Sequence, residues 1–265
     1  MRVLQEEDRE ALIKYVKAEP EMNLFLLGDL ENYGICSENV NFYVHEENGS
    51  WNFVILRFYQ FYILYSQQEN YNREAAIAFL STQEVECISG KTVLLEKIAD
   101  AFPQWKITST YMSRCNQIQC SWQRPQELSV RTLVLEDVPE AIDLLCTIEE
   151  FADTYANKEK AVNIKRMQEE MEQGGKKVMG GYVDGKLVAI AETSAENSES
   201  AMIVGVATDI AYREKGYASI VVSALCEDCF KRGMKFLCLF YNNPKAGKIY
   251  QKIGFTEVGT YGMMR

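Results

Sequence analysis

The spacing of apolar residues alternates along the first 120 residues between the period of a helix and that of a strand. Apolar positions three or four residues apart predict helices, whereas alternation and short apolar runs predict strands. Asn48-Gly49 lies between two such runs and is typical of a type I′ hairpin turn. The expected elements are helices at about 6–18, 22–33, 73–80 and 91–101, and strands on both sides of 48–49 and at 61–65, 86–89 and 106–112.

The second half of the chain has the same mixture of patterns. Leu135-Glu136-Asp137-Val138-Pro139 predicts a helix start, because acidic residues and proline suit a first turn. Asp184-Gly185 is a second type I′ turn pair between apolar strands. The other expected elements are strands at 129–135, 176–183, 186–194, 201–208, 236–241 and 255–258, a helix at 159–172, and helices that end at Arg232 and Ile253.

A short polar stretch with a proline, residues 121–126, separates the two halves. A chain of 265 residues is about right for two domains. We therefore predict an α/β (α+β) protein with domains at 1–122 and 127–265. Leu4–Asp8 and Val134–Asp137 both precede a helix with similar acidic residues, so an internal duplication is open, although many α/β domains would show the same pattern.

Composition excludes several classes of protein. Hydrophobic residues are 47% and charged residues 25%, which is enough for a full core and excludes disorder or coiled coil as the main state. The net charge of −10 argues against nucleic acid or an anionic membrane as a partner. The one histidine, His45, is expected at the surface beside a hairpin turn, so histidine-based catalysis is not expected.

The chain has no apolar signal core at its N-terminus, and its longest apolar stretch, 51–65, is interrupted by Arg57 and Gln60. That stretch is shorter than the ~20 residues of a membrane span. We therefore expect a cytoplasmic protein with no membrane partner. Eight cysteines are too sparse for a disulfide scaffold, and Cys226-x-x-Cys229 is interpreted as helix packing, with metal or redox chemistry as the alternative.

One glycine-containing turn has residues that are suited to binding an anionic ligand. Arg213-Glu214-Lys215-Gly216-Tyr217-Ala218 follows the strand that ends at Thr208 and opens a helix. Small residues there let backbone N–H groups approach a ligand, and a helix N-terminus favours an anion. Residues 211–265 carry a net charge of +5, against −15 for the rest of the chain. This local charge suits a phosphate-bearing small molecule, although an ordinary helix-capping turn is the alternative.

A second motif follows about 30 residues later. Asn243-Pro244 predicts an N-cap and a first helical residue, and the pattern continues as N-P-K-A-x-x-x-Y-x-K-x-G-F. Together with R-x-x-G-x-A after a strand, it resembles the GNAT superfamily of CoA-dependent N-acyltransferases. The stretch 205–219 is similar to the glycine N-acyltransferase-like branch. The resemblance covers about 128–265, and it departs at Ile210, where relatives often carry proline.

The resemblance implies a mixed twisted sheet flanked by helices in the C-terminal domain. The N-terminal domain lacks a second R-x-x-G-x-G/A motif, so if it is a degenerate GNAT-like repeat it has lost cofactor binding. It is expected to cover part of the acceptor cleft or to mediate dimerisation.

The resemblance also assigns cofactor-binding residues. The backbone of Val206, Ala207 and Thr208 should bind the pantetheine arm of acetyl-CoA as an added strand would. Gly205 should form a bulge that directs an N–H group at the thioester carbonyl. Asn243 is expected as an N-cap, with contact to the CoA arm as the alternative. The pyrophosphate should lie on Arg213, Glu214, Lys215, Gly216, Tyr217, Ala218 and Ser219.

Two residues are candidates for proton transfer. Tyr250 matches the family tyrosine that protonates the departing thiolate, and a core tyrosine is the alternative. Glu192 is our candidate base for the incoming amine, directly or through water, and an exposed strand glutamate is the alternative. Glu149, Glu150 and Asp153 lie in the segment that shapes the acceptor site in relatives, and we assign them no role.

The resemblance therefore predicts an N-acyltransferase that passes an acetyl group from acetyl-CoA to a primary amine by direct attack in a ternary complex. The rival hypothesis is a non-catalytic CoA-binding sensor on the same fold. No metal site is expected. The amine acceptor is not identified, although the acidic surplus elsewhere in the chain favours a cationic one. A homodimer stays open.

Overall fold

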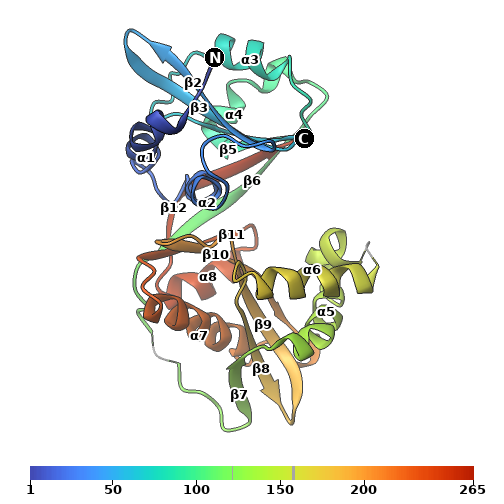
Figure 1. Cartoon of the computed structure of the whole chain (residues 1–265). Helices are drawn as coiled ribbons and strands as arrows, with labels where there is room; N and C mark the ends of the chain where they lie inside the picture. Colours follow the sequence, from blue (N-terminus) through green and yellow to red (C-terminus); the bar gives the residue numbers. More distant parts are fainter. Residues whose placement is uncertain (121, 157–158) are drawn as a thin grey trace. The chain divides into compact units, whose positions relative to one another are not determined.

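The computed structural model describes residues 1–120, 122–156 and 159–265. The chain forms two compact units: unit 1 comprises residues 1–112 and 257–265, and unit 2 comprises residues 113–256. It passes into unit 2 along β6 (Ile107–Cys115) and returns to unit 1 along β12 (Thr256–Met264) (Figure 1). The last strand of the chain thus belongs to unit 1, and the predicted domain boundary, which groups this strand with the second domain, differs from the structure here.

Unit 1 contains one mixed sheet with the strand order β1-β2-β3-β4-β5-β12-β6. Consecutive strands from β1 to β4 are antiparallel, and β4 and β5 are parallel. The final strand is predicted to end at 258, but it extends to Met264 because antiparallel pairing with β5 continues to that residue. The other strands are β1 (Arg2–Val3), β2 (Val40–Glu47), β3 (Ser50–Phe58), β4 (Phe61–Tyr65) and β5 (Cys87–Lys91).

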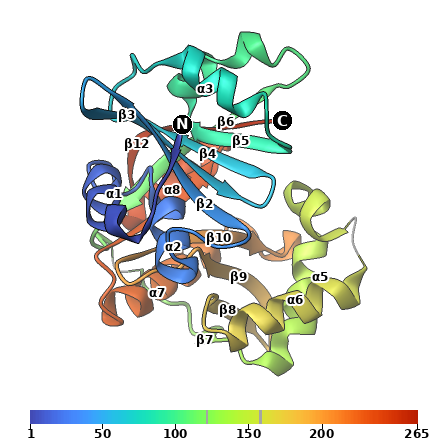
Figure 2. The ribbon, with the colours of Figure 1, turned by 45° about the horizontal axis from the view of Figure 1, so that its top comes forward.

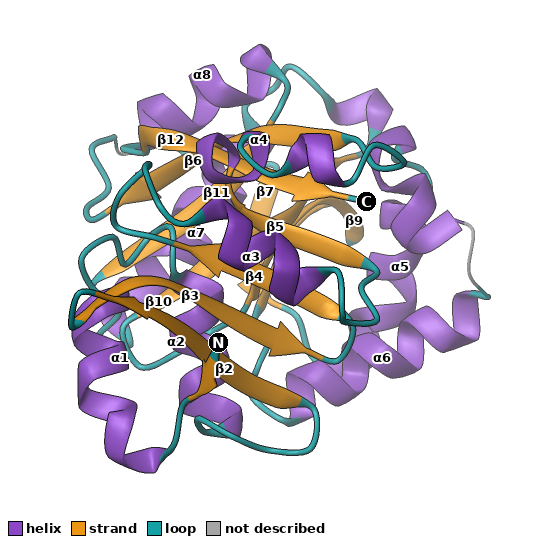
Figure 3. Cartoon of the chain, turned by 90° about the horizontal axis from the view of Figure 1, so that it is seen from above, coloured by secondary structure: helices purple, strands orange, loops and turns teal. Residues whose placement is uncertain are grey.

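Helices cover both faces of this sheet. One face packs against α1 (Arg9–Val16) and α2 (Leu24–Tyr33), and the other against α3 (Arg73–Leu80) and α4 (Thr92–Glu96) (Figure 3). The helix expected at 6–18 begins with a 3₁₀ turn at Glu6–Asp8, and the one expected at 91–101 ends with a 3₁₀ turn at Ala99–Ala101. His45 lies near the end of β2 beside the Asn48-Gly49 turn, as predicted, but it is only partly exposed because its ring stacks on Phe53 at a centroid distance of 5.2 Å.

Unit 2 repeats this plan of strands. Its sheet has the order β7-β8-β9-β10-β11, with antiparallel neighbours from β7 to β10 and a parallel β10–β11 pair. Residues 113–115 of β6 also belong to this unit, and the Arg114 guanidinium lies 4.4 Å from the centre of the Phe236 ring. The strands are β7 (Leu128–Thr132), β8 (Val178–Val183), β9 (Lys186–Ser194), β10 (Ser200–Thr208) and β11 (Phe236–Tyr241).

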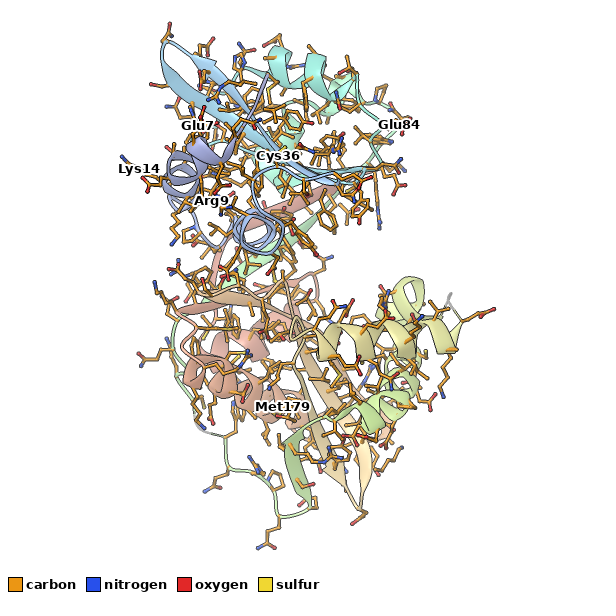
Figure 4. All side chains as sticks on the ribbon, in the orientation of Figure 1. Glu7, Arg9, Lys14, Cys36, Glu84 and Met179 are labelled. Atoms are coloured by element: carbon orange, nitrogen blue, oxygen red, sulfur yellow. The ribbon has the colours of Figure 1, made fainter. Side chains whose placement is uncertain are left out.

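Two hydrophobic cores lie on opposite faces of the unit 2 sheet. α5 (Val138–Cys146) and α6 (Lys160–Glu172) cover one face, while α7 (Tyr217–Lys231) and α8 (Pro244–Ile253) cover the other (Figure 2). Met179 on β8 belongs to the core beneath α7 (Figure 4). The β9 residues divide between the cores: Leu187 and Ile190 face α5, whereas Val188, Ala189 and Ala191 face α7. The alternation breaks at Val188, where the register with β8 shifts.

Several local predictions are confirmed. Asn48 and Gly49 have φ values of 52° and 77°, and Asp184 and Gly185 have values of 50° and 80°, as a type I′ turn requires. Cys226 and Cys229 are fully buried in the core beneath α7, which confirms the packing interpretation. Within the described residues, no helix combines the length and apolar character that a membrane crossing requires.

Candidate functional site

Strands β10 and β11 separate part-way along their length. Their parallel pairing runs from Ser200↔Phe236 to Ile203↔Leu239, although β10 continues to Thr208 and β11 to Tyr241. Ala207 and Thr208 pair with β9 on the other side. The edge of β10 that faces away from β9 is therefore unpaired by β11 beyond Ile203, and an extended ligand can add to it as a further strand.

A bulge interrupts β10 at the point where the two strands separate. The register with β9 shifts between Val204 and Ala207, so that Gly205 and Val206 have no partner in β9. Gly205 has φ of +59°, a conformation that favours glycine. A Cβ atom built on Gly205 would lie 2.3 Å from Oε1 of Glu192. The bulge and the position of Glu192 therefore both require glycine here.

The turn after β10 presents a row of free backbone N–H groups. Glu214 and Gly216 have positive φ values of 66° and 79°, and the first hydrogen bond of α7 runs from Ile220 N–H to Gly216 O at 3.2 Å. Among the described residues, the N–H groups of 214–219 have no hydrogen-bond acceptor. Nothing lies within 4 Å of a Cβ atom placed on Gly216, so the turn is open to a ligand.

The side chains around this turn leave its mouth clear. Arg213, Glu214 and Lys215 are exposed, and Arg213 Nε donates to the carbonyl oxygen of Thr208 at 3.2 Å. Ile210, at the departure from the family pattern, is 80% exposed. The Tyr217 side chain is buried, so only its backbone faces the turn. A helix N-terminus with free N–H groups and two cations beside it is suited to a phosphate group.

Thr208 contributes a polar atom that the described residues do not satisfy. Its Oγ1 is buried and has no hydrogen-bond partner among them. Unsatisfied buried hydroxyl groups are uncommon, since each costs about 1–3 kcal/mol. Thr208 ends the unpaired edge of β10, so a bound ligand with a polar group is one way to satisfy it.

Tyr250 lies on α8, whose start follows the predicted pattern: the side chain of Asn243 accepts from Lys245 N–H at 2.9 Å, which confirms the N-cap. The Tyr250 ring packs between Tyr241 and Phe255, each 6.1 Å away, and is 8% exposed. Burial raises the pKa of its hydroxyl to about 12. The hydroxyl has no hydrogen-bond partner among the described residues, so its proton is available at neutral pH.

Glu192 is buried at 2% exposure, so the alternative of an exposed strand glutamate is wrong. Its Oε2 accepts from Lys176 Nζ at 2.9 Å, and its Oε1 accepts from the Tyr155 hydroxyl at 3.0 Å. Its Cα pairs with Val178 on β8 and Val204 on β10, one residue before the bulge. The fold thus brings Glu192 and Gly205 together, although they lie on different strands.

The two hydrogen-bond partners of Glu192 are not indicated by any pattern in the sequence. Tyr155 lies in the single-turn helix η5 (Ala152–Ala156), and Lys176 lies between α6 and β8. Neither belongs to a motif, because only the fold brings them to Glu192. Glu149, to which we assign no role, is exposed, and the side chains of Glu150 and Asp153 lie outside the described residues.

Comparison with known proteins identifies relatives at the level of family and fold. A model of the GNAT acetyltransferase family matches residues 25–264. A search of curated proteins gives no significant match.

Solved structures share the fold at low sequence identity. A Drosophila protein is 13% identical, with a TM-score of 0.72, over 99% of this chain and 97% of its own. A GCN5-related N-acetyltransferase from Kribbella flavida is 13% identical, with a TM-score of 0.60, over 80% of this chain and 86% of its own. A GCN5-related N-acetyltransferase-like protein from Streptococcus suis is 15% identical, with a TM-score of 0.58, over 98% of each chain.

Proposed function

This chain belongs to the GNAT acetyltransferase family, and on that premise we propose that it transfers an acetyl group from acetyl-CoA to a primary amine. The amine attacks the thioester directly, without a covalent enzyme intermediate. An N–C bond forms, the C–S bond breaks, and CoA leaves as the thiol. The observation that carries the proposal is the unpaired edge of β10, which leads from the Gly205 bulge to the free N–H groups of 214–219.

The residues present fit acetyl-CoA. The backbone of Val206, Ala207 and Thr208 offers strand-like hydrogen bonds to the pantetheine arm, and the Thr208 hydroxyl needs a partner. Residues 213–219 would hold the pyrophosphate on six N–H groups, with Arg213 and Lys215 beside them. Bound acetyl-CoA supplies the activated acyl group. Asn243 already serves as an N-cap, so a contact with the CoA arm is left to its amide nitrogen.

Tyr250 would supply a proton to the sulfur of the leaving group. A general acid must hold its proton at the working pH, and the pKa of about 12 ensures that this hydroxyl does. Its packing in the core fixes the ring without consuming the hydroxyl in another hydrogen bond. The two interpretations of Tyr250, as core residue and as acid, are therefore compatible.

Glu192 would accept the proton of the attacking amine. An ammonium group cannot attack, because its nitrogen lone pair is bound to a proton. Glu192 lies against Gly205, where the bulge would direct an N–H group at the thioester carbonyl. Proton removal by Glu192 on β9 and stabilisation of the developing negative charge on the carbonyl oxygen by the β10 bulge would thus act at one place.

A free-thiol release assay with acetyl-CoA across a library of primary amines tests this function. We expect thiol release that depends on one class of amine, with the acetylated amine identified by mass spectrometry. Calorimetry with CoA separates binding from catalysis. Binding of CoA without turnover of any amine would favour the rival, a non-catalytic CoA-binding sensor, and absence of binding would contradict both.

A further inference from the structure

The carboxylate of Glu192 is held at both oxygens by side chains from outside its own strand. Lys176 Nζ donates to Oε2 and lies 3.0 Å from Glu170 Oε2 in α6, so it joins the two carboxylates. The Tyr155 hydroxyl donates to Oε1. With one donor at each oxygen, the carboxylate is restricted to the orientation in which Oε1 lies against Gly205.

Burial makes this arrangement costly unless it is complete. The side chains of Lys176 and Glu192 are 10% and 2% exposed, and a buried charge is tolerated only when it is paired and hydrogen-bonded. Burial alone would lower the pKa of Lys176, but the charges of Glu192 and Glu170 outweigh it and raise that pKa above its ordinary value. Lys176 is therefore a cation at neutral pH, and Glu192 faces a fixed positive charge.

The other groups around Glu192 can be named element by element. On α6, the Arg166 guanidinium lies 5.6 Å from the centre of the Tyr155 ring, and Glu170 is 42% exposed. The paired residues on β8 and β10, Val178 and Val204, carry no charge. Tyr155 is itself held through its backbone oxygen, which accepts from Asn163 Nδ2 at 2.8 Å. Burial and the charge of Glu192 raise the pKa of the Tyr155 hydroxyl, so it stays a donor.

We propose that Lys176 and Tyr155 are positioning residues for acyl transfer, which fix the carboxylate of Glu192 against the Gly205 bulge so that it accepts the amine proton there. This inference rests on the proposed function. Counted from the neutral amine, the nitrogen gives one proton to Glu192 as the N–C bond forms, and Tyr250 gives one to the sulfur as the C–S bond breaks. Glu192 then releases its proton to solvent and Tyr250 regains one from solvent, so the exchange balances. Neither positioning residue touches the reacting atoms.

The test is the split between kcat and the KM for acetyl-CoA in Lys176→Met, Lys176→Arg and Tyr155→Phe. Without the donor at Oε2, the carboxylate can turn away from the bulge, so Lys176→Met should lower kcat by about tenfold while the KM is unchanged. Tyr155→Phe removes the donor at Oε1 and should lower kcat by less. Lys176→Arg keeps a cationic donor and should restore kcat toward the original value.

The controls separate a positioning role from a structural one. Lys165→Met removes an exposed lysine of α6 whose Nζ lies 3.7 Å from Glu169 Oε1, and it should leave kcat unchanged. The KM for acetyl-CoA should change less than about twofold in every variant, because Lys176 and Tyr155 bond to Glu192 and not to residues 206–219. Circular dichroism verifies folding, and Tyr155→Phe carries the test if Lys176→Met does not fold.

Two results overturn the inference in different ways. A Lys176→Met enzyme that is folded and keeps full kcat contradicts positioning but leaves the proposed function intact. A Glu192→Gln enzyme with full turnover contradicts the base assigned in the proposed function, and the positioning role with it.

Discussion

Units 1 and 2 share the order and pairing directions of their strands, but only unit 2 has an open edge beside a helix N-terminus among the described residues. In unit 1, β4 pairs with β5 through Leu64↔Gly90, and a Cβ atom on Gly90 would lie 2.3 Å from Leu64 O. The β3–β4 pairing has no bulge. In unit 2, β10 bulges and separates from β11. The same topology therefore leaves a strand edge unpaired where β10 separates from β11.

The helices that follow β4 and β10 also differ, because α3 has a side-chain cap and α7 has none. Asn72 caps α3 with its side chain, which accepts from Ala75 N–H at 3.0 Å, and its own N–H donates to Asn52 Oδ1 at 2.7 Å. α7 begins at Gly216 with no side-chain cap. A capped helix end is satisfied by the chain itself, whereas an uncapped one keeps its donors for solvent or a ligand. The start of α7 therefore keeps a donor that the Asn72 side chain satisfies in α3.

The largest effect is expected from substitution of the bulge glycine. Gly205→Ala combines a positive φ with a contact of 2.3 Å to Glu192, so it should lower kcat by about 10²–10³-fold, the range for loss of an oxyanion donor. Gly90→Ala is the matched change in unit 1. Gly90→Ala should lower the melting temperature but leave kcat per folded molecule unchanged. A Gly205→Ala enzyme with normal kcat would show that the bulge takes no part in catalysis.

Tyr250→Phe should lower kcat by about 10²-fold, a typical contribution of general acid catalysis. α4 follows β5 in unit 1 as α8 follows β11 in unit 2, and α4 has no tyrosine between Thr92 and Glu96. With a pKa of about 12, Tyr250 stays protonated as the pH rises, so its ionisation should cause no fall in kcat between pH 7 and 10. Rates measured across this interval check the assignment, and a decline absent from Tyr250→Phe would contradict it.

Gly216→Asp should raise the KM for acetyl-CoA by about tenfold, or about 1.4 kcal/mol, because a carboxylate would face the phosphate groups. The position has open space, and aspartate tolerates a positive φ better than most residues do. Asn72→Asp places the same charge at the equivalent point of unit 1 and should leave KM unchanged. Equal effects of the two substitutions would mean that the charge acts at long range.

The smallest effect is expected for the cap of α3. Asn72→Ala should lower the free energy of unfolding by about 1 kcal/mol, the usual value of an N-cap, with no change in KM or kcat. Denaturant titration together with steady-state kinetics measures both. A change in KM with no loss of stability would show that unit 1 contributes to ligand binding.

Features that depend on a few adjacent residues can be predicted from the sequence. The type I′ pairs at 48–49 and 184–185, the cap at Asn243 and the helix start at Gly216 are of this kind. Such signals are strong because steric limits on φ and local hydrogen bonds act within one turn. The family motifs are equally local, and they mark the strand whose edge is unpaired.

Partners that lie far apart in the chain cannot be predicted in this way. Nothing in the pattern around Glu192 indicates that Lys176 and Tyr155 meet its carboxylate, or that Glu257–Arg265 joins unit 1. Periodicity tells which residues alternate along a strand but not which face is covered, and burial depends on packing of segments far apart in the chain. Residue order alone thus located the open turn at 213–219 and Tyr250, and folding in three dimensions converted a strand glutamate into a buried carboxylate with a hydrogen-bond donor at each oxygen.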